Sequence, residues 1–354
     1  MKIIFVIPNM TGGGTERVIS LLSDAYVKMG FEVAIMQFAG YEHAYQLNDK
    51  VEDFSVAGQS NGNPFVMLKR LIRMRRYYKK NPDAYIFSFC IMGAFFSVIA
   101  TFGMKRYMLV AERSSPENWD RVRLRNWAYR RLNTVTFQTA DGISYFPEDI
   151  AKKAVVIPNP IDAAIPARYE GRRSHRVVSV GRLHKVKNHA MLIDSFAAFS
   201  GQYPDYELHF YGQGDLEGEL KQRAENLKIS DKVVWHGFCG NVTKEVQDAG
   251  MFVLSSNYEG ISNSMLEALA MGIPTICTDC PIGGARMYIE NGVNGFLVPV
   301  DDREALTEAM CRIASDEALA DRMSRNAVKV REHYSVESIA GQFLEAAGIA
   351  YPLK

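Results

Sequence analysis

Cysteine is scarce in this chain, and its distribution argues against a disulfide framework. Five cysteines are scattered over 354 residues. An odd, scattered set with no recognisable signal peptide before it is typical of reduced thiols in the cytoplasm. Cys277 and Cys280 have redox-motif spacing, but one such pair supplies too few ligands for structural zinc. The seven histidines show no metal-ligand spacing either, so we expect no metal site.

An excess of charge of one sign is also missing from the whole chain, although the two halves differ. The net charge is +1, but residues 1–165 carry +6 and residues 166–354 carry −5. The basic excess lies in residues 69–80 and in residues 119–131, where two tryptophans are interleaved with arginines. Such segments suit an anionic membrane surface or a phosphorylated acceptor, and they equally suit a solvated helix face. No nucleic-acid-binding motif accompanies them, so we expect no nucleic-acid partner.

Long apolar runs are few, and the longest uncharged stretch divides into two elements. Residues 84–104 contain no charged side chain and are long enough to span a bilayer. Residues 85–89 are typical of a buried strand, and residues 93–102 of a helix packed on a sheet. This division favours a soluble or peripheral protein over one that crosses the membrane.

The order of the apolar segments predicts parallel α/β sheets. Residues 2–8 form a continuous apolar run, a glycine loop and an amphipathic helix follow it, and residues 33–38 form a second apolar run. This order of strand, loop, helix and strand predicts a right-handed crossover between parallel strands. The same order restarts at residues 176–180. The fold class is therefore α/β, with doubly wound parallel sheets.

A linker rich in proline, alanine and arginine at residues 159–173 separates the two halves. We predict a Rossmann-like acceptor-binding domain over residues 1–165 and a Rossmann-like nucleotide-sugar-binding domain over residues 166–335. A length of 354 residues is comfortable for two domains of about 150 residues each. Two such domains in series place a ligand cleft where the carboxyl ends of their sheets face each other.

The strongest functional signal runs from Glu259 to Glu267 and opens a helix after an apolar strand. Ser262, Asn263 and Ser264 are expected at the N-terminus of that helix, where backbone amides favour an anion such as a diphosphate. A carboxylate on the preceding loop can hold sugar hydroxyls, and one on the helix can accept from a ribose. As a hydrolase pair, the two carboxylates would lie about 12 Å apart along a helix, whereas retaining hydrolases need roughly 5 Å.

Two further signals are glycine turns. Gly181, Arg182, Lys187 and Asn188 lie at a strand-to-helix turn, where the Arg182 fork and the Lys187 charge suit a departing diphosphate. Two surface bases on a helix turn are the alternative. The glycine loop at residues 12–14 does not match the dinucleotide fingerprint and gives only a close backbone approach to a ligand.

Together these segments are similar to glycosyltransferase family 4, a GT-B family, over nearly the whole chain. Residues 181–188 and 259–267 match in order and spacing, as do Ile-Pro-Asn-Pro-Ile at residues 157–161 and the segment at residues 291–299. The resemblance implies two Rossmann-like domains facing a cleft, retention of configuration, and no cofactor or metal. It also implies that a helix within residues 336–354 crosses back onto the first domain.

The resemblance also implies residue roles. Arg182 and Lys187 would bind the donor diphosphate, Glu259 the donor sugar and Glu267 the ribose. Residues 212–215 and 237–242 would surround the base. The predicted donor-binding residues are Gly13, Gly14, Arg182, Lys187, Gly212, Phe238, Asn241, Gly260, Ile261, Ser262, Asn263, Ser264 and Glu267. The predicted catalytic residues are Glu259, Arg182, Lys187 and Glu112.

Glu112 marks a departure from the family pattern. Many family members place a histidine near the acceptor in the first domain, but here the only histidine before residue 175 is His43. Glu112 follows a strand at the position where such a group is expected. A structural carboxylate paired with Arg113 explains it equally well.

Within the family, residues 111–116 and 277–281 resemble the subgroup that extends lipid-linked or surface glycans from UDP-sugars. We therefore expect retaining transfer of a hexose or N-acetylhexosamine to a hydroxyl of such a glycan. The expected location is cytoplasmic, peripheral on the inner face of the cell membrane. The segment from Pro281 to Arg286 departs from the usual family pattern, so the sugar stays open. The alternatives are a phosphorylase or nucleotide-sugar hydrolase on the same fold, and a non-catalytic sugar-nucleotide-binding subunit.

Overall fold

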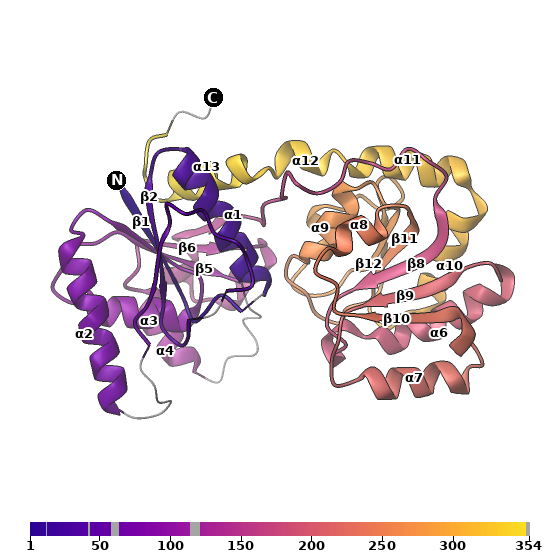
Figure 1. Ribbon diagram of the computed structural model, residues 1–354, viewed down its shortest axis with the longest axis horizontal. Helices are drawn as coiled ribbons and strands as arrows, with labels where there is room; N and C mark the ends of the chain where they lie inside the picture. The colour runs from indigo at the N-terminus through magenta and orange to yellow at the C-terminus, as the bar shows by residue number, and fades with distance from the viewer. Residues whose placement is uncertain (12, 42, 58–63, 114–120, 352–354) are drawn as a thin grey trace. The chain divides into compact units, whose positions relative to one another are not determined.

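The chain folds into two compact α/β units, shown in a computed structural model (Figure 1). The first unit joins Met1–Asp162 to Tyr334–Lys354, and the second is Ala163–His333. The boundaries expected from the sequence were three residues later at the first crossing and two residues later at the second. The structure describes all residues except 12, 42, 58–63, 114–120 and 352–354.

The first unit is built on a parallel sheet with the strand order β3-β2-β1-β4-β5-β6-β7. Its strands are β1 (Lys2–Ile7), β2 (Glu32–Gln37), β3 (Glu52–Ser55), β4 (Tyr85–Ser88), β5 (Met108–Glu112), β6 (Thr134–Phe137) and β7 (Ala154–Val156). Its helices are α1 (Gly14–Lys28), α2 (Pro64–Lys80), α3 (Ile91–Ala100), α4 (Val122–Tyr129), η2 (Asp141–Tyr145), α5 (Glu148–Ala151) and α13 (Val336–Ala346).

Two apolar layers cover the two faces of this sheet, because successive strand residues point to opposite sides. Ile4 and Val6 of β1 pack with the cluster that contains α2, α3 and α4. Ile3 and Phe5 pack with the cluster that contains α1 and α13. The C-terminal helix α13 is thus part of the first unit's core, and the Tyr26 hydroxyl donates to its Ala340 carbonyl at 3.1 Å.

The uncharged stretch at residues 84–104 forms the short strand β4 and the ten-residue helix α3. Both are largely buried in the first unit. Within the described part of the chain, no helix combines the length and the apolarity that crossing a bilayer requires.

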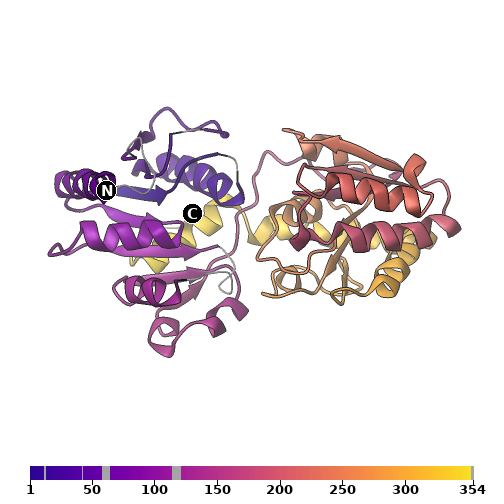
Figure 2. The same ribbon diagram turned by 90° about the horizontal axis from the view of Figure 1, so that it is seen from below.

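The second unit contains a parallel sheet with the strand order β10-β9-β8-β11-β12-β13. Figure 2 shows helices on both sides of it. The strands are β8 (Ser174–Val180), β9 (Glu207–Tyr211), β10 (Val233–Gly237), β11 (Ala249–Leu254), β12 (Thr275–Thr278) and β13 (Phe296–Val298). The helices are η3 (Lys185–Lys187), α6 (His189–Gln202), α7 (Glu217–Asn226), η4 (Ser230–Lys232), α8 (Val242–Val246), α9 (Asn263–Ala270), η5 (Ala285–Met287), α10 (Arg303–Ser315), α11 (Glu317–Ala327) and α12 (Val330–His333).

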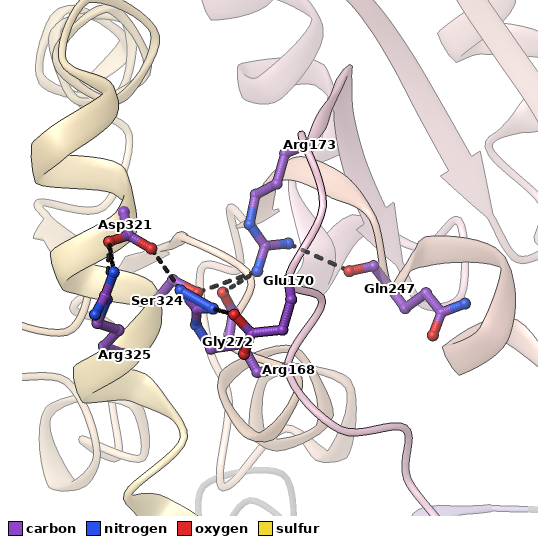
Figure 3. Close-up of polar contacts among 8 residues, drawn as sticks. All are labelled: Arg168, Glu170, Arg173, Gln247, Gly272, Asp321, Ser324 and Arg325. Carbon is purple, nitrogen blue, oxygen red and sulfur yellow. Dashed lines mark hydrogen bonds and ion pairs between the residues drawn. The ribbon is translucent and has the colours of Figure 1, made fainter.

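Arg168 and Arg173 hold the segment before β8 in place through hydrogen bonds and ion pairs (Figure 3). Arg173 donates to Ser324 Oγ at 3.1 Å and to three backbone carbonyls. These carbonyls belong to Gln247, Ala249 and Gly272. Burial lowers the pKa of Arg173 well below its ordinary value, to about 10. Arg168 donates to Ser324 Oγ at 3.0 Å and pairs with Asp321. Residues 168–173, predicted as part of the linker, therefore belong to the second unit and are held there by these contacts.

Candidate active site

The loops that follow β8 and β9 touch backbone to backbone, and a glycine makes this possible. Gly181 N donates to the Tyr211 carbonyl at 2.9 Å, and Leu183 N donates to the Gln213 carbonyl at 3.0 Å. A Cβ atom on Gly212 would lie 1.9 Å from the Gly181 carbonyl oxygen, and the φ angle of Gly212 is +147°. Only glycine satisfies both conditions. The predicted donor-site residue Gly212 thus has a packing role that fixes the Gly181–Arg182 turn.

The turn before α6 is joined to the loop after β11 by an ion pair between Lys187 Nζ and Glu259 Oε2. Both side chains are mostly buried, with 19% and 23% of their surfaces exposed. Ser255 Oγ donates to the Lys187 carbonyl at 2.9 Å, which holds the backbone of the turn against the same loop. The structure therefore brings together two predicted residues that stand 72 positions apart in the sequence.

The N-terminus of α9 lies at the end of β8. Ser262 caps the helix by accepting a hydrogen bond from Met265 N at 3.4 Å. Ser264 Oγ donates to the Val180 carbonyl at 3.0 Å, so the first turn of α9 is fixed to the last residue of β8. Asn263 begins the helix, and Glu267 is buried one turn later. The amide end of this helix and Lys187 thus occupy one end of the second sheet, where an anion is favoured.

A close backbone contact also fixes the loop that carries Glu259. Glu259 N donates to the Pro281 carbonyl at 2.8 Å. A Cβ atom on Gly284 would lie 1.6 Å from the Gly260 carbonyl oxygen, so this approach too requires glycine. Ile261 is buried beneath the loop. The predicted residues Gly260 and Ile261 therefore hold the backbone in place.

Arg182 and His189 lie on either side of Lys187 in the sequence, and they differ in exposure. Arg182 is exposed, and among the described residues no side chain pairs with it. His189 is 4% exposed, and its Nδ1 has no hydrogen-bond partner in the described part of the chain. Burial, followed by the nearby charge of Lys187, lowers the pKa of His189 from 6.5 to about 4. The site therefore holds a neutral buried imidazole beside an available cation.

The segment after β10 lies next to the Gly212 loop, because Gly212 N donates to the Gly237 carbonyl at 2.8 Å. The Phe238 ring is 80% exposed, which is unusual for a large apolar side chain. Asn241 is exposed and begins the short helix α8. These two predicted residues therefore stand at the same end of the second sheet as Gly212.

The predicted residues of the first unit are placed differently. Gly13 and Gly14 begin α1 after β1, while residue 12 lies outside the described residues. Glu112 ends β5 and is 5% exposed, and its Oε2 accepts a hydrogen bond of 2.6 Å from the Tyr129 hydroxyl. Arg125 is 2% exposed and lies 4.0 Å from the Phe146 ring centroid. Glu112 is therefore a buried, internally satisfied carboxylate.

The prediction that residues 119–131 form a basic surface is wrong for Arg125. Its guanidinium is packed into the core, where the Phe146 ring and the charge of Glu112 compensate its burial. Arg130 is engaged as well, in an ion pair of 2.6 Å with Asp149. Residues 119 and 120, and residues 114–116 of the family-like segment, lie outside the described residues.

A cavity of about 710 Å³ lies elsewhere in the second unit, where the strands begin. Its walls include Arg168, Arg173, Ser174 and Gly250. The donors of Arg168 and Arg173 are already used on protein acceptors (Figure 3). The predicted donor residues lie where the strands end, so the volume of this cavity does not make it the donor site. In the described chain, no group of three or more His, Cys, Asp or Glu side chains is placed to hold a metal.

Known proteins share both the sequence pattern and the fold. Residues 167–330 match the family of glycosyl transferases group 1. Nearly the whole of the second unit therefore matches this family. Two similar proteins come from Campylobacter jejuni. N-acetylgalactosamine-N,N'-diacetylbacillosaminyl-diphospho-undecaprenol 4-alpha-N-acetylgalactosaminyltransferase is 26% identical, with 93% of this chain and 94% of the relative covered. GalNAc-alpha-(1->4)-GalNAc-alpha-(1->3)-diNAcBac-PP-undecaprenol alpha-1,4-N-acetyl-D-galactosaminyltransferase is 24% identical, with 98% of each chain covered.

The fold of this chain is GT-B, as predicted. The structure of Anabaena HepE in complex with UDP and glucose matches it with a TM-score of 0.85 and 19% identity, with 98% of this chain and 99% of that chain covered. The two parallel-sheet units of this chain account for that likeness.

The sequence places Asn188 at the turn before α6 but does not predict the side chains that hold it there. Asn188 adopts a left-handed conformation with φ 46° and caps α6. Its Nδ2 donates to Asn257 Oδ1 at 2.7 Å and to Asp301 Oδ1 at 2.6 Å. Asp301 stands 113 positions away, so no local pattern links the two. The usable signal was the asparagine itself, since asparagine tolerates this conformation better than most residues.

Proposed function

We propose that this enzyme transfers a hexose or N-acetylhexosamine, with retention, from a UDP-sugar to a hydroxyl of a lipid-linked or surface glycan precursor, without a metal. The observation that carries the proposal is the Lys187–Glu259 ion pair beside the N-terminus of α9. Lys187 and the helix amides supply positive charge for a departing diphosphate. Glu259 supplies a carboxylate to which sugar hydroxyls donate. Exposed Arg182 completes the cationic group through its planar fork.

The second unit also supports a nucleotide donor. The Phe238 ring is exposed at the same sheet end, where it offers an apolar face to a nucleobase. Glu267 on α9 is proposed to accept from the ribose. The HepE structure was solved with UDP and glucose, and its likeness to this chain makes UDP the first nucleotide to test.

The proposed chemical step is a displacement on one face of the sugar. The bond between the anomeric carbon and the diphosphate oxygen breaks, and a bond from the acceptor oxygen to the same carbon forms. The departing phosphate takes the acceptor's proton, so both the electrons and the proton end on the nucleoside diphosphate. Lys187 and Arg182 stabilise the charge that develops there, while the protein positions the partners.

The acceptor is proposed to be a glycan held at a membrane surface on the cytoplasmic side. The names of both Campylobacter relatives state an undecaprenol-linked acceptor. Helix α2 contains seven basic side chains and no acidic one. It also exposes 73% of Phe65, 54% of Leu68 and 41% of Ile72. Apolar and cationic side chains on one exposed helix suit a bilayer rich in anionic lipid.

These α2 side chains follow helical spacing and form one stripe, called here the α2 outer face. Its members are Phe65, Leu68, Lys69, Ile72, Arg73 and Arg76. Residues 119–131 supply less of the proposed contact, because Arg125 is buried and Arg130 is paired. We therefore assign the proposed membrane contact mainly to α2.

A donor survey tests the proposed function. Purified protein in EDTA is incubated with UDP-, GDP- and ADP-sugars, with and without detergent-extracted lipid-linked glycans, and nucleoside diphosphate release is measured. We expect release from one UDP-sugar only when the glycan is present. Glycan-independent release would identify a hydrolase. UDP binding with no release from any donor would favour a non-catalytic subunit, and the absence of binding would overturn the donor assignment.

A further inference from the structure

A second polar group lies in the first unit, where the chain after β2 folds back over β1. Met10 and His43 form a parallel backbone bridge, and Ala44 N donates to the Met10 carbonyl at 2.9 Å. The Tyr45 hydroxyl donates to the Gly13 carbonyl at 3.3 Å. His43 is therefore held beside the end of β1, just before the glycine loop.

This position is where the strand order reverses. β2 and β3 lie on one side of β1, and β4 to β7 lie on the other. In open parallel sheets, ligands bind at the carboxyl ends of the strands at such a reversal. The topology therefore places His43 at the ligand-binding end of the first sheet, independently of the donor residues in the second unit.

Three side chains in this region form a directed chain of hydrogen bonds. Gln37 is fully buried, and its Nε2 donates to Asp53 Oδ1 at 3.0 Å and to Oδ2 at 3.3 Å. Asp53 Oδ2 lies 2.9 Å from His43 Nε2. The amide orients the carboxylate, and the carboxylate orients the imidazole. An ionised carboxylate only accepts, so the neutral ring carries its proton on Nε2 and keeps Nδ1 as an acceptor.

The orientation of the Gln37 amide is energetically unfavourable, which argues against a purely structural role for the His43 group. Gln37 Oε1 is buried without a hydrogen-bond partner in the described residues, and such a loss is unfavourable. The amide nonetheless turns its nitrogen towards Asp53. Tyr41 meets His43 edge-on, with ring centroids 4.9 Å apart at 88°, so the imidazole is fixed from a second side. His43 keeps 31% of its side chain exposed, whereas Asp53 keeps 11%.

The chemistry of the group suits an uncharged sugar. A neutral imidazole nitrogen accepts a hydrogen bond from a hydroxyl, and the neighbouring carboxylate disfavours a phosphate. Tyr41 is 58% exposed and offers a ring face, whose negative potential suits the C–H groups of a pyranose. This combination differs from the cationic donor site at Lys187.

We propose that His43, oriented by Asp53 and Gln37, accepts a hydrogen bond from a hydroxyl of the acceptor glycan, with Tyr41 against the face of the same sugar. This inference rests on the proposed transferase function and names the acceptor side of it. His43 binds and orients the acceptor, and takes no proton in the transfer step.

The test uses the full chain and the detergent-extracted glycan that supports wild-type nucleoside diphosphate release. His43→Phe keeps a ring and removes the acceptor nitrogen. We expect its acceptor KM to rise roughly tenfold, as for one lost hydrogen bond, with the donor KM and UDP affinity unchanged. Asp53→Asn no longer fixes the ring tautomer, so we expect a smaller rise. His43→Asn places an amide oxygen near the position of the ring nitrogen Nδ1, where it can accept a hydrogen bond. Its acceptor KM should therefore lie between those of the wild type and His43→Phe.

His175→Phe is the matched control, because His175 is an exposed histidine of the second unit that stacks on Tyr206. It should leave both KM values unchanged. An unchanged acceptor KM in His43→Phe would overturn the inference. So would a parallel rise of the acceptor and donor KM values with a lower melting temperature, since that marks a structural role. Failure of the proposed function shows earlier and separately, as absence of glycan-dependent release by the wild type.

Discussion

The two units differ in how they hold polar groups at the carboxyl ends of their sheets. In the second unit, Lys187 pairs with Glu259, Ser264 is fixed to β8, and glycines allow backbones to touch. In the first unit, Glu112 is buried in the core and α2 exposes apolar and cationic side chains. The second unit thus presents a preorganised cationic site. The first presents the group around His43, which suits an uncharged ligand, and the exposed α2 outer face.

The proposed function gives this contrast a physical reason. A diphosphate leaving group needs charges that are already in place, because reorganising them during the reaction costs activation energy. A glycan acceptor presents hydroxyls and apolar ring faces, which are bound by many weak contacts. Substitutions in the preorganised site of the second unit should therefore have larger effects than substitutions on the α2 outer face of the first unit.

The largest effect is expected from Lys187→Ala. The substitution removes the cation and leaves Glu259 without its partner, so we expect kcat/KM to fall by roughly 10²- to 10³-fold, as for other stabilising donors. Nucleoside diphosphate release measures it. Lys221→Ala is the control, because the Lys221–Glu217 pair is exposed and contributes little. A loss of less than about threefold would contradict the assignment, as would full activity in Glu259→Ala together with none in Glu267→Ala.

The buried His189 predicts acid sensitivity of the second unit. Its folded pKa of about 4 lies below its ordinary 6.5, so between these values the unfolded chain binds a proton that the folded chain does not. Stability is therefore complete above pH 6.5 and falls as the pH approaches 4, by up to about 3 kcal/mol. Urea unfolding across this range measures it. His189→Phe should remove the slope and exposed His175→Phe should keep it. An equal slope in both variants would contradict the prediction.

Much of this architecture could be predicted because its signals are local. Apolar runs located buried strands, and residues 176–180, where the second strand–helix order begins, lie within β8. The loops after β8 and β11 were both assigned to a diphosphate from their residues, and the parallel sheet brings the two loops to the same edge. Strand β3 was missed because its half-buried sequence, Glu-Asp-Phe-Ser at the edge of the sheet, lacks an apolar run.

The errors concern contacts between residues that are distant in the sequence. Arg125 stands in a basic run and was predicted to be exposed, yet Phe146 and Glu112 compensate its burial. Neither partner is recognisable from residues 119–131. The tie between Asn188 and Asp301 is another example, because each residue alone suits an ordinary cap or turn. Burial of charge is therefore the property that the sequence predicts least well here.

A smaller effect is expected when the touching backbones of the second unit are forced apart. In Gly212→Ala, the new Cβ would meet the Gly181 carbonyl oxygen, so we expect about 1–3 kcal/mol of destabilisation and weaker donor binding. Thermal unfolding and UDP titration measure the two effects. Gly240→Ala is the matched control, because its Cβ would meet nothing within 4 Å. Equal behaviour of the two variants would show that the contact between the β8 and β9 loops does not constrain the site.

The smallest effect concerns the α2 outer face. Each basic residue near an anionic bilayer contributes about 1 kcal/mol, so Arg73→Ala and Arg76→Ala should each weaken binding to vesicles containing anionic lipid about fivefold. Sedimentation with vesicles at low and high salt measures this, and salt should reduce the difference. Arg322→Ala removes an exposed arginine of α11 as the control.

Phe65→Ser tests the apolar part of the same face, and its effect should persist at high salt because burial of a ring is not screened. If Arg322→Ala weakens binding as much as Arg76→Ala does, the attraction belongs to the charge of the whole chain. The contrast between the two units would then rest on the donor site alone. If only the α2 variants lose binding, the acceptor-bearing unit also provides the membrane contact, and a lipid-linked glycan would meet the enzyme at the surface that holds its lipid.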